Sequence, residues 1–395
     1  MPDSGNYPPL FHLAMSWFVG SSVELSIVLM RLFSALVVSS LLALTMWLFP
    51  PRYRLVLLLV MLTAFTTQGY FLLASINPSS WAVVGVGLGW LALHAALTPG
   101  EQSMGRRVAL ACVCLLAWIM AIGSRWDAAG FVVLTAVMTC FQLVWVCFPK
   151  RRKILALGTF ALGFVSAAVV QKLTIIDPFR LFRKLFSYGD GDPDNLAFFT
   201  QNFLNGLPNS IKAFGEVASH PGVVLPGIVF QAALVLFGFL MLQAFNGKNP
   251  LQLLGFVATT SAISLMFMAW HSSRDERDAT ELSSRYALPL LVFAVGWWFL
   301  LGPVNLLQRI SSHLRVASIT STALFALTVL TYAERHVDIQ TLGLRYLPEG
   351  LDQWWWPWLP VGPNVLVVFA IVCMWRFFES FRIHVMPVEP ETRPA

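Results

Sequence analysis

Two oppositely charged side chains lie two residues apart in the segment SRWDA, where Arg125 and Asp127 separate two long apolar runs. A guanidinium binds phosphate oxygens through paired N–H donors, and a nearby carboxylate can orient the phosphate or an acceptor hydroxyl. The same two groups can instead satisfy one another as a structural ion pair at a tight turn. The sequence leaves both interpretations open.

Arginine and tyrosine form a doublet at two further places. Arg285 and Tyr286 open an apolar run in SSRYALP, and Arg345 and Tyr346 precede the tryptophan-rich segment WWWPW. The tryptophans are typical of an interfacial aromatic belt, with a stacking platform for a sugar or prenyl chain as the alternative.

Three single residues complete the set of candidates for binding and catalysis. Arg31, inside the first long apolar run, is a further candidate phosphate ligand. Asn77 in INPSSW is predicted to cap the following helix, or alternatively to bind a polar donor group. Asp3 is a second candidate catalytic acid beside Asp127, although nothing near it in the sequence would hold it in position.

Basic residues alternate with aromatic ones in PFRLFRKLF. On a helix, the phenylalanines share one face, and Arg180, Arg183 and Lys184 point the other way. Such a helix lies in the membrane interface, where it serves as an anchor. Capture of a lipid phosphate or pyrophosphate is the alternative function.

Three aspartates follow at alternate positions in GDGDPDN, namely Asp190, Asp192 and Asp194. Oxygen ligands at this spacing can hold a divalent cation, although the segment lacks the glycine and glutamate of an EF-hand loop. A solvated acidic turn is the alternative interpretation. A divalent cation is therefore the one candidate cofactor, and the sequence implies no other.

The composition identifies an integral membrane protein. Of 395 residues, 57% are hydrophobic and only 12% are charged, and the mean hydropathy is +0.69. Long continuous apolar runs favour transmembrane helices over a barrel, whose strands would alternate. The five cysteines all lie inside apolar runs and are interpreted as buried thiols.

We predict an all-α polytopic bundle of about eleven transmembrane helices, counting about 20 apolar residues per crossing. The predicted spans are Glu24–Phe49, Leu55–Ser75, Ser80–Leu97, Val108–Gly123, Ala128–Phe148, Ile154–Val170, Val223–Phe245, Leu251–Trp270, Tyr286–Gly302, Ala317–Ala333 and Asn364–Arg376. Residues 1–377 would form the transmembrane domain and residues 378–395 a cytoplasmic tail. The long connections, 171–222, 271–285 and 334–363, would lie outside.

Basic residues gather at the predicted cytoplasmic joins, for example in PPRYR after the first span. By the positive-inside rule the amino terminus then lies outside the membrane and the carboxyl terminus on the cytoplasmic side. This topology explains the net charge of +6, so no nucleic-acid partner is implied. An outer amino terminus without a signal peptide leads us to expect a missing first helix upstream of Met1.

Several enzyme and transporter classes are not favoured. The predicted spans carry almost no ionisable residue near mid-depth, which an ion-coupled transporter needs. The sequence contains no Walker loop, HExxH, CxxC or GxSxG motif, so nothing indicates an ATPase, a zinc enzyme or a serine hydrolase.

The motifs YPPLFH, SINPSSWA, SRWDA and SSRYALPLL, followed by Arg-Tyr and WWWP, occur in this order along nearly the whole chain. In order and placement they resemble the bacterial membrane protein family named domain of unknown function 2142. That family is similar in turn to the GT-C glycosyltransferases, which take a sugar from a polyprenyl-phosphate donor at the outer membrane face.

The resemblance implies a GT-C-like fold and an inverting sugar transfer. An acidic residue would deprotonate or orient the acceptor hydroxyl, and cations would stabilise the leaving phosphate. The cation candidates in this sequence are Arg31, Arg125, Arg285 and Arg345. The resemblance implies that both arginine–tyrosine doublets bind the phosphate of a lipid-linked donor. The implied partners are the lipid bilayer, a polyprenyl-phosphate-linked sugar and an envelope glycan acceptor.

The chain departs from the family pattern before YPPLFH, where relatives have a helix and an acidic outer loop and this sequence has only Asp3. The resemblance is therefore compatible with an active enzyme or with a truncated or inactive one. The alternative class is a non-catalytic membrane protein, such as a lipid or polysaccharide export component or a scaffold.

Overall fold

The computed structural model describes residues 8–65, 68–73, 75–98, 102–147, 227–272, 286–336 and 363–385. Within these ranges the secondary structure is helical and no strand occurs, which confirms the predicted all-α class. The helices are α1 (Pro9–Ser16), α2 (Val23–Leu48), α3 (Pro51–Thr63), α4 (Gln68–Leu73), α5 (Pro78–Leu97), α6 (Met104–Ser124), α7 (Trp126–Cys147), α11 (Gly227–Gln243), α12 (Pro250–Ser272), α13 (Leu288–Leu300), α14 (Leu306–His336) and α15 (Pro363–Val385).

Four helical segments in the described ranges are long and apolar enough to cross a membrane, namely Val23–Leu48, Pro78–Leu97, Met104–Ser124 and Asp127–Trp145. A helix of about 20 residues matches the roughly 30 Å of hydrocarbon in a bilayer. The protein is therefore a helical membrane protein. The predicted span Ile154–Val170 lies outside the described residues, and the total of eleven crossings stays a prediction.

Three predicted boundaries differ from the structure. The predicted span Leu55–Ser75 contains two helices, since α3 ends at Thr63, whose hydroxyl donates to the carbonyl of Leu59. The predicted connection 303–316 is helical from Leu306, because its apolar residues recur at helical spacing and are buried. α15 runs on to Val385, beyond the predicted end of its span.

Two further features account for these longer helices. In the first turns of α14, Leu306, Ile310 and Leu314 are buried while the polar residues between them face outward. In the last turns of α15, Arg382 donates to Glu379 one turn earlier. Both patterns are amphipathic, so a search for continuous apolar runs misses them.

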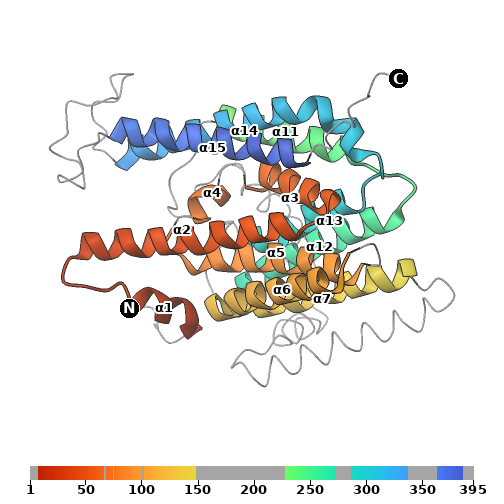
Figure 1. Cartoon of the computed structure of the whole chain (residues 1–395), viewed down its shortest axis with the longest axis horizontal. Helices are drawn as coiled ribbons and strands as arrows, with labels where there is room; N and C mark the ends of the chain where they lie inside the picture. The colour runs from red at the N-terminus through yellow and green to blue at the C-terminus, as the bar shows by residue number, and fades with distance from the viewer. Residues whose placement is uncertain are drawn as a thin grey trace.

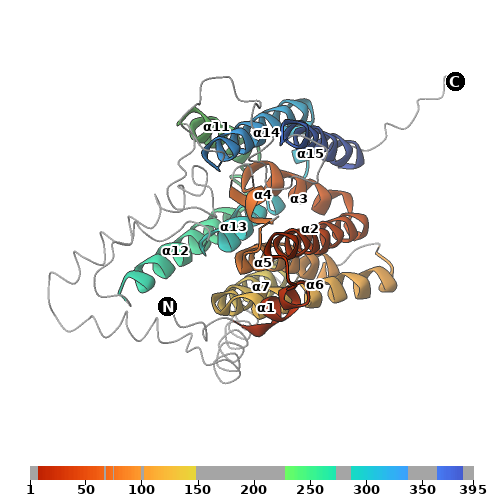
Figure 2. The ribbon, with the colours of Figure 1, turned by 90° about the vertical axis from the view of Figure 1, so that its left-hand side faces the viewer.

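The helices form a layered bundle (Figure 1). α11, α14 and α15 lie together along one side, α6 and α7 lie toward the opposite side, and α2, α3, α5 and α13 lie between them. The view turned by 90° keeps this order, and it shows α1 below α6 and α7 (Figure 2). The layered arrangement leaves α5 in contact with α6, α7 and α13 at once.

Glycines allow α5 to occupy this central place. A Cβ at Gly85 would lie 2.7 Å from the Cβ of Ala121 on α6, and a Cβ at Gly87 would lie 2.7 Å from Val292 on α13. A Cβ at Gly89 would collide with Trp118. Gly85 and Gly89 therefore serve helix packing, since small residues let membrane helices approach closely.

Arginines bind the carboxyl-terminal carbonyls of three helices. The bonds run from Arg54 and Arg106 to α2, from Arg107 to α5 and from Arg52 to α13. Cations are favourable at these helix ends, where carbonyl groups lack partners in the helix. The three helices therefore end on one side of the bundle, which we call the basic end.

Candidate functional site

The side chain of Arg125 is the centre of a polar cluster at the opposite end of the bundle. Its Nε donates to Asp127 Oδ1 over 2.8 Å, its Nη2 pairs with Asp127 Oδ2, and its Nη1 donates to Ser79 Oγ over 2.8 Å. The guanidinium carbon lies 4.5 Å from the centroid of the Tyr286 ring. We call Arg125, Asp127, Ser79 and Tyr286 the Arg125 cluster. It joins α5, the α6–α7 junction and the start of α13.

Helix caps place the members of this cluster. Asn77 Oδ1 accepts a hydrogen bond from the backbone N–H of Ser79 over 2.9 Å, so Asn77 is the N-cap of α5, as one of its two interpretations predicted. Arg125 follows the last residue of α6 in an extended conformation, and α7 begins at the next residue. Asp127 then lies in the first turn of α7, where the helix dipole favours a negative charge.

The two charged side chains of the cluster differ in their exposure to solvent. The side chain of Arg125 is 2% exposed, whereas that of Asp127 is 37% exposed. Three of the N–H directions of the guanidinium are occupied by Asp127 and Ser79, and one face is covered by Tyr286. A phosphate could reach Arg125 only by displacing these partners, while the Asp127 carboxylate remains open to a ligand. Arg125 therefore holds Asp127 in place.

Helix α1 packs beside the cluster. Its Phe11 is 1% exposed and meets the ring of Trp81 edge-on, with the centroids 5.2 Å apart. Its Leu10 lies against Gly123 in the last turn of α6, where a Cβ would come within 2.7 Å of Leu10 Cβ. The sequence did not predict this helix. It closes one side of the end of the bundle that carries Asp127.

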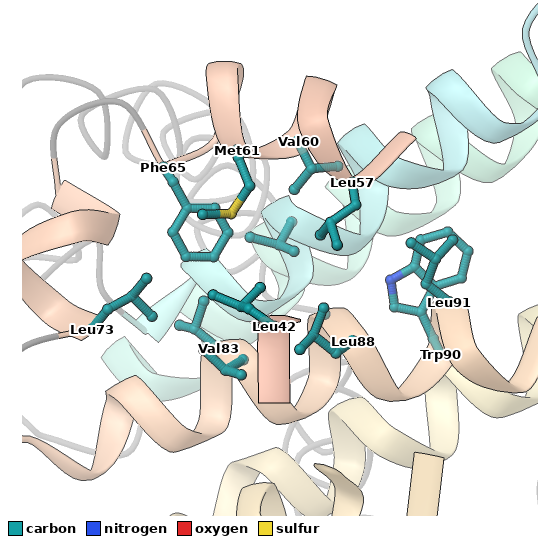
Figure 3. A pocket seen from close by; sticks show the side chains of 13 residues that line it. Leu42, Leu57, Val60, Met61, Phe65, Leu73, Val83, Leu88, Trp90 and Leu91 are labelled. Atoms are coloured by element: carbon teal, nitrogen blue, oxygen red, sulfur yellow. The ribbon is translucent and has the colours of Figure 1, made fainter. Parts of the chain in front are cut away.

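An apolar cavity runs along α5 toward the middle of the bundle (Figure 3). It is small, with a volume of about 20 Å³ that holds about one water-sized sphere, and side chains from α2, α3, α4, α5 and α13 line it. On α5 the lining extends from Val83, one turn beyond Ser79, to Leu91. Among the described lining residues, the polar N–H is that of the Trp90 indole, which has no hydrogen-bond partner in the described structure. The cavity is therefore an apolar packing gap, and a hydrocarbon chain could enter it only if the lining side chains moved apart.

A second buried polar network lies near the basic end. Tyr53 Oη lies 2.8 Å from His94 Nδ1, and His94 Nε2 lies 2.6 Å from Gln142 Oε1. Since an amide oxygen only accepts, Nε2 donates, and Nδ1 accepts from Tyr53 if the imidazole is neutral. The network links α3, α5 and α7, and its members satisfy one another. Sequence reasoning missed it because these residues are far apart along the chain.

The remaining sequence candidates do not join the Arg125 cluster in the described structure. Arg31 lies on the exposed face of α2, about 12 Å along the axis from Val23 at 1.5 Å per residue. The other candidates lie outside the described residues: Asp3, Arg180, Arg183, Lys184, Asp190, Asp192, Asp194, Arg285, Arg345 and Tyr346. Among the described residues, no group of histidine, cysteine, aspartate or glutamate side chains could hold a metal ion.

Ser79 is the member of the cluster that sequence reasoning did not single out. The feature of the sequence that could have identified Ser79 is its position in SINPSSWA, one of the motifs on which the family resemblance rests. Comparisons with protein-family models, curated proteins and solved structures found no match to this chain. The fold and the site thus define an α-helical membrane protein with a partly exposed carboxylate at one end of its bundle.

Proposed function

We propose that the protein is a GT-C-like glycosyltransferase, which transfers a sugar from a polyprenyl-phosphate donor to an envelope glycan acceptor at the outer face of the bacterial cytoplasmic membrane. The observation that carries the proposal is the Asp127 carboxylate, partly exposed and held by the buried Arg125. A lipid-linked donor is favoured because the Arg125 cluster lies at the end of apolar helices long enough to cross a membrane, so a donor held in the bilayer could reach it.

In this proposal Asp127 accepts the proton of the acceptor hydroxyl. The hydroxyl oxygen forms a bond to the anomeric carbon of the sugar, and the bond from that carbon to the phosphate oxygen breaks. Polyprenyl phosphate leaves with the electron pair, and the anomeric configuration inverts. Arg125 acts as a positioning residue, because its bonds to both carboxylate oxygens leave Asp127 little freedom to rotate.

The leaving phosphate needs a cation of its own, since the guanidinium of Arg125 is occupied. Arg285 precedes Tyr286 in the sequence, which makes it the candidate nearest to the cluster along the chain. Arg31 is a second candidate, because the side chain of a helical residue points toward the amino end of its helix. A divalent cation on Asp190, Asp192 and Asp194 remains a further prediction.

Purified full-length protein in proteoliposomes tests the proposed activity. A panel of polyprenyl-phosphate-linked sugars is supplied with envelope glycan acceptors, and the release of polyprenyl phosphate is followed. We expect release that depends on both an acceptor and the protein. Absence of release with every donor and acceptor, from protein that unfolds cooperatively, would contradict the enzyme hypothesis.

The burial of Arg125 in its ion pair favours a second candidate function. A guanidinium with all its partners inside the protein is suited to a structural role in a non-catalytic export component or scaffold. In that case Arg125 and Asp127 join three helices and touch no substrate. Loss of stability without loss of glycan transfer in Asp127 variants would favour this function.

A further inference from the structure

Two arginines share the same backbone acceptors at the basic end of the bundle. The Nη2 atoms of Arg54 and Arg106 both lie 3.3 Å from the carbonyl oxygen of Trp47. Both side chains also donate to the carbonyl of Phe49, Arg54 from Nε over 2.7 Å and Arg106 from Nη2 over 3.3 Å. The end of α2 thus holds two guanidinium groups side by side.

Within the described part of the chain, no acidic side chain balances the charge of this pair. No carboxylate among the described residues pairs with either side chain, and the end of a helix contributes only about half a negative charge. Each guanidinium has five N–H donors, so each keeps donors that the carbonyls do not use. Two like charges held together in this way favour the binding of an anion between or above them.

The exposed apolar side chains around the two arginines indicate that the anion carries hydrocarbon chains. Both arginines are half-buried, and the apolar side chains beside them are exposed: Trp47 is 72% exposed and Met104 is 73% exposed. Farther along the faces of α2 and α6, Leu44 and Val108 are exposed as well. A small anion from water would leave these apolar side chains exposed. A phospholipid would cover them with its acyl chains while its phosphate binds the arginines.

We propose that Arg54 and Arg106 form a binding site for the phosphate group of an anionic phospholipid in the leaflet at the basic end. The two guanidinium groups would bind the phosphate oxygens, and the acyl chains would lie along the exposed faces of α2 and α6. The lipid would stabilise the joint between α2, α3 and α6. This site is independent of the Arg125 cluster, which lies at the other end of the bundle.

A lipid titration of the purified full-length protein in neutral detergent tests the site. Bound lipids are counted by native mass spectrometry, with dioleoyl phosphatidylglycerol and dioleoyl phosphatidylcholine compared. We expect phosphatidylglycerol to bind the wild type at least about tenfold more tightly, and Arg54→Gln to weaken it about tenfold, as for the loss of one charge-assisted contact. Arg309→Gln is the matched control, because it removes an exposed positive charge near the start of α14 and should change nothing.

If Arg54→Gln cannot be purified, Arg54→Lys replaces it. Lysine keeps the positive charge but lacks the planar, paired N–H donors of the guanidinium. We therefore expect phosphatidylglycerol to bind about threefold to tenfold more weakly. Equal binding of the two lipids by the wild type overturns the proposal, and so does unchanged binding by the Arg54 variant. A rise in the thermal midpoint with inorganic phosphate alone, as large as that with the lipid, would assign the site to a free anion and also overturn it.

Discussion

The guanidinium of Arg125 stacks on the ring of Tyr286, with the guanidinium carbon 4.5 Å from the ring centroid. This contact ties the junction of α6 and α7 to the start of α13, which follows Tyr286 by two residues. A desolvated cation over an aromatic face contributes about 2 kcal/mol. The stacking and the bidentate bond to Asp127 together hold one carboxylate at a defined place on the bundle.

Removing the charge of Arg125 should strongly destabilise the protein. In Arg125→Ala, the Ser79 hydroxyl and the Asp127 carboxylate lose their partner, and breaking a buried pair costs about 3–5 kcal/mol. The Asp127→Asn variant should lose less, because the amide oxygen of asparagine can still accept a hydrogen bond from the Arg125 guanidinium, whose bond to Ser79 and stacking on Tyr286 remain. Thermal unfolding of the purified variants measures the difference. Equal loss in the two variants would contradict the assignment of Arg125 as the buried partner.

A methyl group at Gly85 should weaken the contact between α5 and α6. In Gly85→Ala the new Cβ meets the backbone of Ala117 and the Cβ of Ala121, so the helices must separate, at about 1–3 kcal/mol. The matched control is Gly130→Ala on α7, where no atom lies within 4 Å of the new Cβ. Thermal midpoints that fall equally for both variants would show that close packing at Gly85 is not the cause.

Filling the apolar cavity should impair the use of long-chain donors if their chains enter it by moving the lining side chains apart. Leu88 lines the cavity, and Leu88→Trp would occupy its space at about 1–3 kcal/mol of strain. In that case the KM for long-chain polyprenyl-phosphate sugars should rise and the KM for short-chain analogues should stay the same. The control is Leu115→Trp, on the exposed face of α6. Equal effects on long and short donors would argue that the chain binds elsewhere.

Breaking the buried network near the basic end should affect stability and leave sugar transfer intact. Gln142→Leu leaves the His94 N–H without an acceptor, which should destabilise the protein by about 1–2 kcal/mol. A double variant with His94→Leu should recover part of the loss, because both polar partners are then removed. A large fall in the transfer rate at an unchanged thermal midpoint would instead place this network in the reaction.

The orientation in the membrane can be tested with single cysteines. Trp17, just after α1, is 79% exposed and Met104, at the basic end, is 73% exposed. In a variant without the native cysteines, Trp17→Cys should react with a membrane-impermeant maleimide on intact cells. Met104→Cys should react only after permeabilisation, in keeping with the positive-inside rule. The reverse pattern would place the Arg125 cluster on the cytoplasmic side.

Much of the fold could be predicted because the bilayer requires a long apolar segment for each helix that crosses it. α2, α5, α6 and α7 each begin and end within about four residues of the predicted span, since apolar runs and flanking charges mark both ends. The amphipathic start of α14 could not be found this way. Its buried Ile310 and Leu314 alternate with polar residues, so the segment does not form a continuous apolar run.

The candidate site could be predicted only in part. Arg125, Asp127 and Tyr286 stood out because charge and aromatic residues at the ends of apolar runs are unusual. The sequence could not decide whether Arg125 binds a ligand or Asp127, because that depends on its burial and on Ser79, 46 positions away along the chain. The arginine bonds at the basic end were also missed, since their acceptors are backbone carbonyls.

The most direct test of the account is the rate of sugar transfer by Asp127→Asn relative to the wild type, measured in proteoliposomes at equal folded protein. The variant keeps the size of the side chain and removes its ability to take a proton. If Asp127 is the catalytic base, the rate should fall by about 10²- to 10⁴-fold. A rate equal to that of the wild type would contradict the proposed role of Asp127 and favour a structural role for its pair with Arg125.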